Sequence, residues 1–460
     1  MQQLKKNLKR IGNAYTFSLL KSYAGIQIIS QANSLISLFI ISKYLGPANM
    51  GLISYAQNLA VLSIFINNGI DTWSTYEMLR HNNVGDSDAI NKNNESYISG
   101  IFARSQRAKF TVTVISLLFI IPIILWKSDN NYELTMYMLA IILASISSTF
   151  VTLFNSYAIA TRLIPSLNRG AVVVSIMILV SRVFGVYFGF GVLFFLLLIL
   201  GESLMILSIF IYYNYNIFKR RNLFLSLIDH IYYIRQYKIL YIIKIEWHNM
   251  LQILYSTRYF ISIYIFSLFA SRMDLYMLKH YVDNRQLGIY TAAMRLAEYP
   301  GIVSGIIGNI LVVNLALTVS SKIRHISILI GYISNIALAM FFITLFYFTG
   351  NNITHFIYGD AYDGVATILT IYSVGILGIF INNFSSLIFM THKKEKYLLY
   401  SNIIGAIALT FMCYIWIPVY NTIGAAISSS ISYLLVAFFS VFIAIYIEHR
   451  HHKNKDTTIF

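Results

Sequence analysis

The stretch TIGAAISSSISYLLVAFFSVFIAIYI, residues 422–447, contains no charged side chain. A helix needs about 20 predominantly apolar residues to cross the hydrocarbon core of a bilayer, and this run is longer than that. Its apolar residues follow one another instead of alternating with polar ones, which excludes the strand pattern of a transmembrane β-barrel. The stretch therefore predicts a membrane-spanning helix.

Similar runs occur along the whole chain. Of its 460 residues, 57% are hydrophobic and 11% are charged, whereas soluble proteins carry about 25% charged residues. We therefore predict an all-α, polytopic membrane protein with about 12 transmembrane helices. The other predicted spans lie near 17–41, 50–70, 109–126, 134–160, 170–190, 192–213, 251–272, 288–316, 326–349, 364–390 and 398–418.

The positively charged residues indicate how these spans are oriented. With the N-terminus in the cytoplasm, most of the 34 Lys and Arg residues fall in segments predicted to be cytoplasmic, including 80–109 and 219–244. This bias follows the positive-inside rule and places both termini in the cytoplasm. Topology thus accounts for the net charge of +16, and nucleic acid is not expected as a partner. The single cysteine excludes a disulfide framework, and no cofactor or metal is predicted.

An internal repeat divides the chain into two halves. Residues 37–60 align without a gap to residues 274–297, and Gly51 and Gly288 are among the identical pairs. The aligned segments follow the first helix of each predicted six-helix lobe, so the lobes are related by a pseudo-twofold axis along the membrane normal. Such lobes favour alternating access, and duplication without transport is the alternative. The predicted domains are an N-lobe (1–213), a basic cytoplasmic linker (214–250), a C-lobe (251–447) and a cytoplasmic tail (448–460).

Several short motifs are similar to those of one transporter family. They are KYLGP at 43–47, RMDLYML at 272–278, LGIYTAA at 287–293, YGDAY at 358–362 and IPVYNTIGAA at 417–426. Together they resemble the signatures of the Wzx-type flippases, within the multidrug/oligosaccharidyl-lipid/polysaccharide exporter superfamily. The last motif departs from the family pattern at Asn421, where a glycine is usual, and a turn tolerates asparagine there.

The resemblance implies a flippase and not an enzyme. Its implied activity is to move undecaprenyl-diphosphate-linked oligosaccharide repeat units across the cytoplasmic (inner) membrane of a bacterium, for O-antigen or capsule biosynthesis. The implied partners are this lipid-linked substrate, the lipid bilayer, a coupling proton or cation, and a polysaccharide polymerase with its chain-length regulator.

Two other functions fit parts of the sequence. A drug or cation antiporter of the same superfamily would favour an acidic lumen, whereas the charged residues inside the predicted spans are mostly basic. The basic residues are Lys21, Arg182, Arg258 and Arg295, and the acidic residues are Glu202 and Glu298. A membrane polymerase or glycosyltransferase would need paired carboxylates suited to glycosyl chemistry, and the short predicted outer loops offer none. The sequence also contains no G-x-x-x-x-G-K-[ST] loop for ATP hydrolysis.

Three charged residues in the seventh and eighth predicted spans are candidates for substrate binding. Arg258 and Arg295 lie well inside these spans, where a charge is costly and usually faces a cavity or a partner. We expect their guanidinium groups to form a cationic lumen for the diphosphate of the substrate. Glu298 lies on the same helical face as Arg295 and is expected to balance it or to carry a proton. A purely structural ion pair between Arg295 and Glu298 is the alternative.

The other charged residues have both structural and functional interpretations. Arg182 and Glu202 lie at matched depth on consecutive antiparallel helices, which predicts a buried salt bridge. Asp274 either holds an outer gate through an ion pair with Arg272 or is a solvated loop acid. Lys21 either joins the substrate site or extends its long side chain to the membrane interface.

Overall fold

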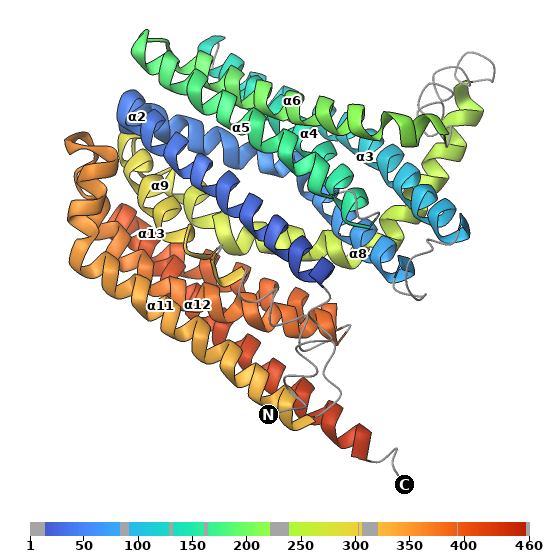
Figure 1. The fold of residues 1–460 in the computed structure, drawn as a ribbon. Helices are drawn as coiled ribbons and strands as arrows, with labels where there is room; N and C mark the ends of the chain where they lie inside the picture. Colours follow the sequence, from blue (N-terminus) through green and yellow to red (C-terminus); the bar gives the residue numbers. More distant parts are fainter. Residues whose placement is uncertain are drawn as a thin grey trace. The chain divides into compact units, whose positions relative to one another are not determined.

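All regular secondary structure in the described part of the chain is helical (Figure 1). The computed structural model describes residues 14–82, 92–127, 132–160, 164–220, 239–301, 303–305, 321–392 and 394–456. Each apolar run predicted to span the membrane lies largely on a helix, and the end of the run 288–316 lies outside the described residues. The all-α, polytopic fold class is therefore confirmed.

The helices are long. In the first part of the chain they are α2 (Ala14–Asn82), α3 (Lys92–Lys127), α4 (Tyr132–Ala160), α5 (Ile164–Tyr187) and α6 (Val192–Arg220). They continue with α8 (Ile239–Leu278), α9 (Asn284–Glu298), α11 (Ser321–Tyr358), the short 3₁₀ helix η1 (Asp360–Tyr362), α12 (Val365–Thr391) and α13 (Glu395–Asp456). Within the described residues, 8 helices are long and apolar enough to cross a membrane. Two of these, α2 and α13, each contain two of the predicted spans.

Two helices contain a residue whose backbone is not helical. In α2 this residue is Gly46, with φ 73° and ψ 171°, directly before Pro47. In α13 it is Asn421, with φ 50° and ψ −121°. A Cβ atom on Gly424 would lie 2.1 Å from the carbonyl oxygen of Trp416, so the chain of α13 folds back closely at this point. Both α2 and α13 therefore comprise two helices, in agreement with the two spans predicted in each.

The backbone of Asn421 allows a direct test. Among the described residues, it is the one residue other than glycine with a positive φ. A φ and ψ near these values are typical of the first central residue of a type II′ turn, where Gly, Asn and Asp dominate and a β-branched residue is an outlier. We expect Asn421→Val to lower the free energy of unfolding by about 1–3 kcal/mol and Asn421→Gly to change it by less than about 0.5 kcal/mol. Thermal unfolding in detergent measures this difference, and equal stability of the two variants would contradict it.

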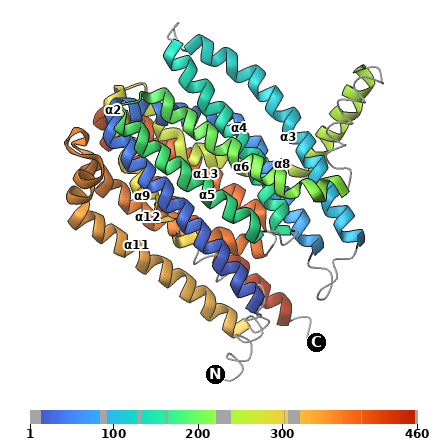
Figure 2. The same cartoon turned by 45° about the horizontal axis from the view of Figure 1, so that its top comes forward.

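The chain divides into two compact units. The first comprises Met1–Ile41 and Leu59–Ile261, and the second comprises Ser42–Asn58 and Ser262–Phe460. Within the first unit, α6 packs against α4 and α5. Within the second, α12 packs against α11, α13 and α9 (Figure 2). The lobe and linker boundaries given by the sequence stay predictions.

Large apolar side chains cover much of the outer surface of the helices. On α13, Phe438 and Phe442 expose 71% and 68% of their surface, and Phe356 on α11 exposes 82%. Soluble proteins rarely expose apolar patches of such extent, and a lipid environment removes their cost. This is a multi-pass membrane protein.

Candidate functional site

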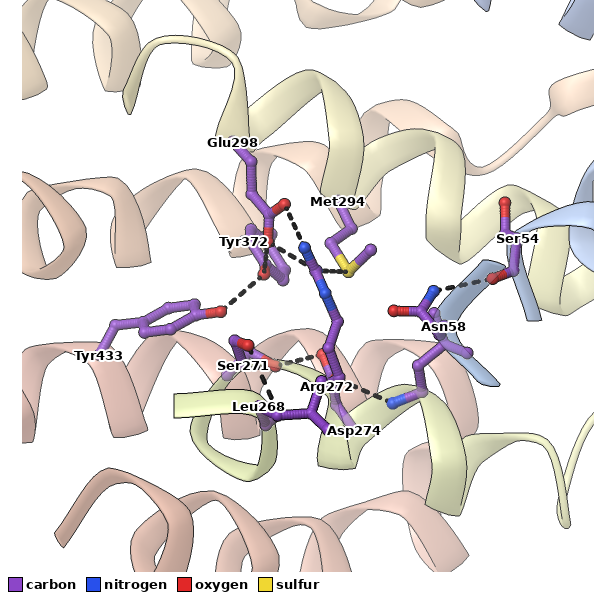
Figure 3. A network of polar contacts seen from close by, with 12 residues as sticks. Ser54, Asn58, Leu268, Ser271, Arg272, Asp274, Met294, Glu298, Tyr372 and Tyr433 are labelled. Carbon is purple, nitrogen blue, oxygen red and sulfur yellow. Dashed lines mark hydrogen bonds and ion pairs between the residues drawn. The ribbon is translucent and has the colours of Figure 1, made fainter. Parts of the chain in front are cut away.

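A network of charged and aromatic side chains connects α8, α9, α12 and α13 in the second unit (Figure 3). The guanidinium group of Arg272 on α8 donates to both carboxylate oxygens of Glu298 on α9, at 2.9 and 3.1 Å. Tyr372 on α12 donates to the same carboxylate at 3.2 Å, and its hydroxyl lies 3.2 Å from that of Tyr433 on α13. Since the side chains of Arg272 and Glu298 are each 26% exposed, the ion pair is mostly buried but keeps some accessible surface.

Glu298 pairs with a different arginine from the one that its sequence neighbourhood suggests. The guanidinium group of Arg295 donates instead to the side-chain oxygen of Gln57 on α2. Residues three apart on a helix point about 60° away from each other, and Arg272 approaches Glu298 in the two-pronged geometry that favours an arginine–carboxylate pair. No carboxylate of the described residues forms an ion pair with Arg295. The hydrogen-bond acceptor that the described residues offer its guanidinium group is a neutral amide.

Asp274 is fully buried, which differs from both interpretations of its sequence position. Its carboxylate accepts hydrogen bonds from the backbone N–H of Leu275 at 2.7 Å, from the hydroxyl of Ser429 at 2.8 Å and from the hydroxyl of Tyr290. Arg272 does not pair with it, because residues two apart on a helix lie on different faces. Asp274 is thus held by neutral donors and is neither a solvated acid nor half of an ion pair with Arg272.

The ion pair expected between Arg182 and Glu202 is present in the first unit. Nη2 of Arg182 on α5 lies 2.8 Å from Oε2 of Glu202 on α6. The other guanidinium nitrogen donates to the hydroxyl of Ser37, and Ser175 donates to Glu202 at 3.3 Å. The side chain of Arg182 is 7% exposed and that of Glu202 is 23% exposed. The contacts link α2, α5 and α6 and favour the structural interpretation of this pair.

The unequal burial of Arg182 and Glu202 predicts unequal effects of removing them. Glu202→Gln leaves the more deeply buried Arg182 as an uncompensated cation, so we expect a loss of about 3 kcal/mol of stability, at the low end for a broken buried pair. Arg182→Gln leaves an acid that is partly exposed and is expected to cost less. Thermal inactivation of the purified variants measures both. A charge-swapped double variant that is no more stable than either single variant would argue against the pair as a stabilising contact.

A second buried ion pair of the first unit is not apparent from the sequence. Lys109 falls in the predicted cytoplasmic segment 80–109, and Asp71 directly follows the predicted span 50–70. In the structure, Nζ of Lys109 lies 2.6 Å from Oδ1 of Asp71, and the lysine side chain is fully buried. The sequence signal is an acid and a base at the edges of two consecutive apolar runs, a pattern that is also typical of solvated loops.

For two predicted substrate-binding residues, Arg258 and Lys21, the role in substrate binding stays a prediction. Arg258 is exposed on α8, and its guanidinium carbon lies 3.9 Å from the ring centre of Tyr255 and 5.2 Å from that of Tyr259. Because Arg258 belongs to the first unit and Arg295 to the second, a lumen shared by both stays a prediction. The side chain of Lys21 lies outside the described residues, and its two interpretations stay open.

A segment of α2, Ser42–Asn58, belongs to the second unit and is anchored there near both ends. The hydroxyl of Tyr362 donates to the carbonyl oxygen of Ser42 at 3.0 Å, and that of Tyr276 donates to the carbonyl oxygen of Asn58 at 2.8 Å. Burial raises the pKa of the Tyr362 phenol, which keeps this group a donor. The bond from Arg295 to Gln57 adds a further contact. We call Ser42–Asn58 the docked segment.

The docked segment meets α9 at two glycines that the internal repeat aligns. A Cβ atom on Gly51 would lie 2.1 Å from the carbonyl oxygen of Asn284, and one on Gly288 would lie 1.8 Å from that of Pro47. Only glycine permits two backbones to approach this closely. The equivalent positions of the two repeats thus form a backbone crossing between the docked segment and α9.

Comparison with solved structures shows which proteins share this arrangement of helices. An inward-facing multidrug resistance MATE family transporter of the MOP superfamily aligns with a TM-score of 0.65 and 13% identity, over 92% of this chain and 96% of that chain. The lipid II flippase MurJ, in an inward closed conformation, aligns with a TM-score of 0.59 and 13% identity, over 91% and 86%. A MOP superfamily transporter from Pyrococcus furiosus gives 0.51 and 12%, over 92% and 98%. The chain has the fold of this superfamily.

The shared fold leaves the substrate open. No protein-family model matches the sequence, and no match is found among curated proteins. The structural neighbours include both a multidrug transporter and a lipid flippase, and one fold commonly hosts several functions. The superfamily indicated by the sequence motifs agrees with the fold, whereas the choice of a Wzx-type flippase depends on the site.

Proposed function

We propose that this chain is a flippase for undecaprenyl-diphosphate-linked oligosaccharide repeat units. It acts in the cytoplasmic membrane of a bacterium, by alternating access, and supplies the synthesis of a surface polysaccharide such as O-antigen or capsule. The sequence motifs support this function, and the fold is shared with a lipid II flippase. The diphosphate and the sugars enter the protein, and the polyprenyl tail stays in lipid.

The observation that carries this proposal is the environment of Arg295. Arg182 and Arg272 are each neutralised by a glutamate. Arg295 is held by the amide oxygen of Gln57, which orients the guanidinium group without cancelling its charge. A phosphate oxygen can replace an amide oxygen as acceptor, and a guanidinium group binds phosphate in a planar, two-pronged geometry. Arg295 is thus a preorganised cation for the diphosphate.

The excess of basic charge inside the spans supports the proposal less strongly than the sequence suggests. Arg258 is exposed, and the structure adds Asp274 and Asp71 to the buried acids. Lys109 is buried as well, but it is paired with Asp71. The support for an anionic substrate therefore lies in the particular pairing of Arg295 and not in a count of charges.

A drug or cation antiporter is the second candidate function, and Asp274 is the observation that favours it. An acidic side chain buried inside a membrane segment, without an ion-pair partner among the described residues, is a candidate partner for a cation. However, Asp274 is fully buried and enclosed by Tyr290 and Ser429. That enclosure leaves no surface of the carboxylate for a drug-sized cation to reach, so the flippase is the better-supported function.

Depletion of this protein from its host distinguishes the candidate functions. The flippase predicts that undecaprenyl-diphosphate oligosaccharide accumulates with its sugars inaccessible from outside, while surface polysaccharide falls. A polymerase or glycosyltransferase defect would instead leave the sugars accessible from outside. If sensitivity to cationic drugs increases and no lipid-linked intermediate accumulates, the proposed flippase function is wrong and the antiporter function is favoured.

A further inference from the structure

The buried cluster around Asp71 and Lys109 forms where α2, α3 and α4 pack together in the first unit. Oδ1 of Asp71 accepts from Nζ of Lys109 at 2.6 Å, and Oδ2 accepts from the hydroxyl of Thr152 at 2.6 Å. The Lys109 ammonium group also donates to the carbonyl oxygen of Thr149. The side chain of Lys109 is fully buried, while that of Asp71 is 11% exposed. Of the two side chains, that of Asp71 therefore retains some exposed surface and that of Lys109 retains none.

Packing alone does not account for a charged pair in this place. A buried ion pair is weak evidence for stability, since apolar residues of similar volume are often as good or better. Ionisable residues inside membrane segments pair with one another and are found in proton relays. Lys109 lies in the middle of α3, a helix of 36 residues, and not at an end where it could reach water.

The surroundings of the pair make its charge sensitive to a single proton. From α2, α3 and α8, the neighbouring core cluster contributes apolar groups, namely Ile70, Ala108, Val112, Met250 and Ile253. The residues that α4 contributes directly are Thr149 and Thr152, which do not titrate in this range, and the ring of Phe150 lies 5.8 Å from the ammonium group. No other charged group of the described residues contacts Asp71 or Lys109. One proton therefore changes the cluster from neutral to singly positive, with no other ionisable group to buffer it.

Asp71 lies on the same helix, α2, as Gln57. Gln57, which holds the Arg295 guanidinium group, lies on α2 about four helical turns before Asp71, so the two side chains point to nearly the same side of the helix. The residues between them are continuously helical.

We propose that Asp71 and Lys109 form the proton-binding site that couples transport to a proton gradient. This inference rests on the proposed transport function and adds the coupling ion and its site. A proton from water binds one carboxylate oxygen of Asp71, Lys109 keeps all of its ammonium protons, and the ion pair is lost. Release of the proton restores the pair. These two states of the pair give the transport cycle its proton-dependent step.

The test uses the full-length protein in liposomes with the membrane potential clamped at zero. The probe is a fluorescent undecaprenyl-diphosphate oligosaccharide, and the readout is its ratio between the two leaflets under a gradient of one pH unit. One proton per cycle supports a ratio of up to about tenfold. We expect Asp71→Asn, and the double variant Asp71→Asn with Lys109→Gln, to bring this ratio to about one while slow exchange continues. Gradient-driven accumulation equal to that of the wild type in a folded Asp71→Asn variant would overturn the proposal, as would driving by sodium alone.

The matched control removes the other buried ion pair of the same unit. The double variant Arg182→Gln with Glu202→Gln is expected to keep the gradient-driven ratio, although its stability changes. A second readout needs no substrate: infrared spectra on acidification are expected to show a protonated carboxyl band in the wild type that is absent in Asp71→Asn. If that band is present but the oligosaccharide is not carried, the proposed substrate fails and the proton site stands. If the band is unchanged by Asp71→Asn, the proton site fails whatever the substrate.

Discussion

Replacing Arg295 by alanine is expected to lower the transport of a diphosphate-linked substrate by about 30-fold or more. Truncating one partner of a buried, hydrogen-bonded charge pair costs about 2–5 kcal/mol, and each 1.4 kcal/mol corresponds to about tenfold in affinity. Among the described residues, Arg295 donates a hydrogen bond to the Gln57 amide and forms no ion pair with a carboxylate. The binding free energy of the diphosphate is therefore expected to depend on this guanidinium group. A fluorescence assay in liposomes measures the loss of transport.

Three control variants separate binding from folding in this experiment. Arg295→Lys keeps the charge but loses the planar geometry and is expected to transport at an intermediate rate. Gln57→Ala leaves the charge in place and is expected to have a smaller effect than Arg295→Ala. Arg272→Ala leaves Glu298 without its ion-pair partner and is expected to act mainly on stability. Normal transport by Arg295→Ala at the wild-type protein level would remove the observation on which the proposed function rests.

Features encoded locally in the sequence could be predicted. The long apolar runs predicted the helices correctly, because the thickness of the bilayer sets the length of an apolar segment that can cross it. The positions of Arg182 and Glu202 gave their ion pair, since consecutive helices of known direction bring equal depths together. The usual glycine position held by Asn421 marks a turn, and its backbone has a positive φ.

Features that depend on helices distant in the sequence could not be predicted. Glu298 has Arg295 three residues before it, yet its partner is Arg272 on another helix. The sequence predicts a cytoplasmic position for Lys109, because the edge of an apolar run does not reveal that α3 begins at Lys92. Spacing along one helix determines which residues share a face, whereas the rotation of each helix against its neighbours decides which of them form a pair.

The crossing of Gly51 with Gly288 connects the internal repeat to the mechanism. The repeat aligns the two glycines, and the structure places the backbone of each against the segment that carries the other. If the protein works by the proposed alternating access, we expect the transport cycle to make and break this contact between equivalent segments of the two repeats. The docked segment is further held by hydrogen bonds from Tyr276, Tyr362 and Arg295. Docking of this segment therefore depends on the glycine crossing and on these hydrogen bonds.

A methyl group at this crossing is therefore expected to undock the segment. In Gly288→Ala, the new Cβ atom would lie 1.8 Å from the carbonyl oxygen of Pro47, which is backbone and cannot rotate away. Overpacking of this kind costs about 1–3 kcal/mol, which shifts the equilibrium between docked and undocked states by about 5- to 150-fold. Ser54→Cys places a thiol at a fully buried position of the docked segment, and its labelling rate by a water-soluble reagent is expected to rise accordingly.

The control for this prediction is a glycine with open space around it. A Cβ atom on Gly201 of α6 would meet no atom within 4 Å, so Gly201→Ala is expected to leave both labelling and transport unchanged. Gly51→Ala is expected to reproduce the effect of Gly288→Ala, because its Cβ atom meets the backbone of Asn284 from the other side of the same crossing. If both alanine variants keep Ser54→Cys protected while transport is lost, the crossing is not a closing contact. If labelling rises and transport falls together, undocking of this one segment is enough to stop the cycle.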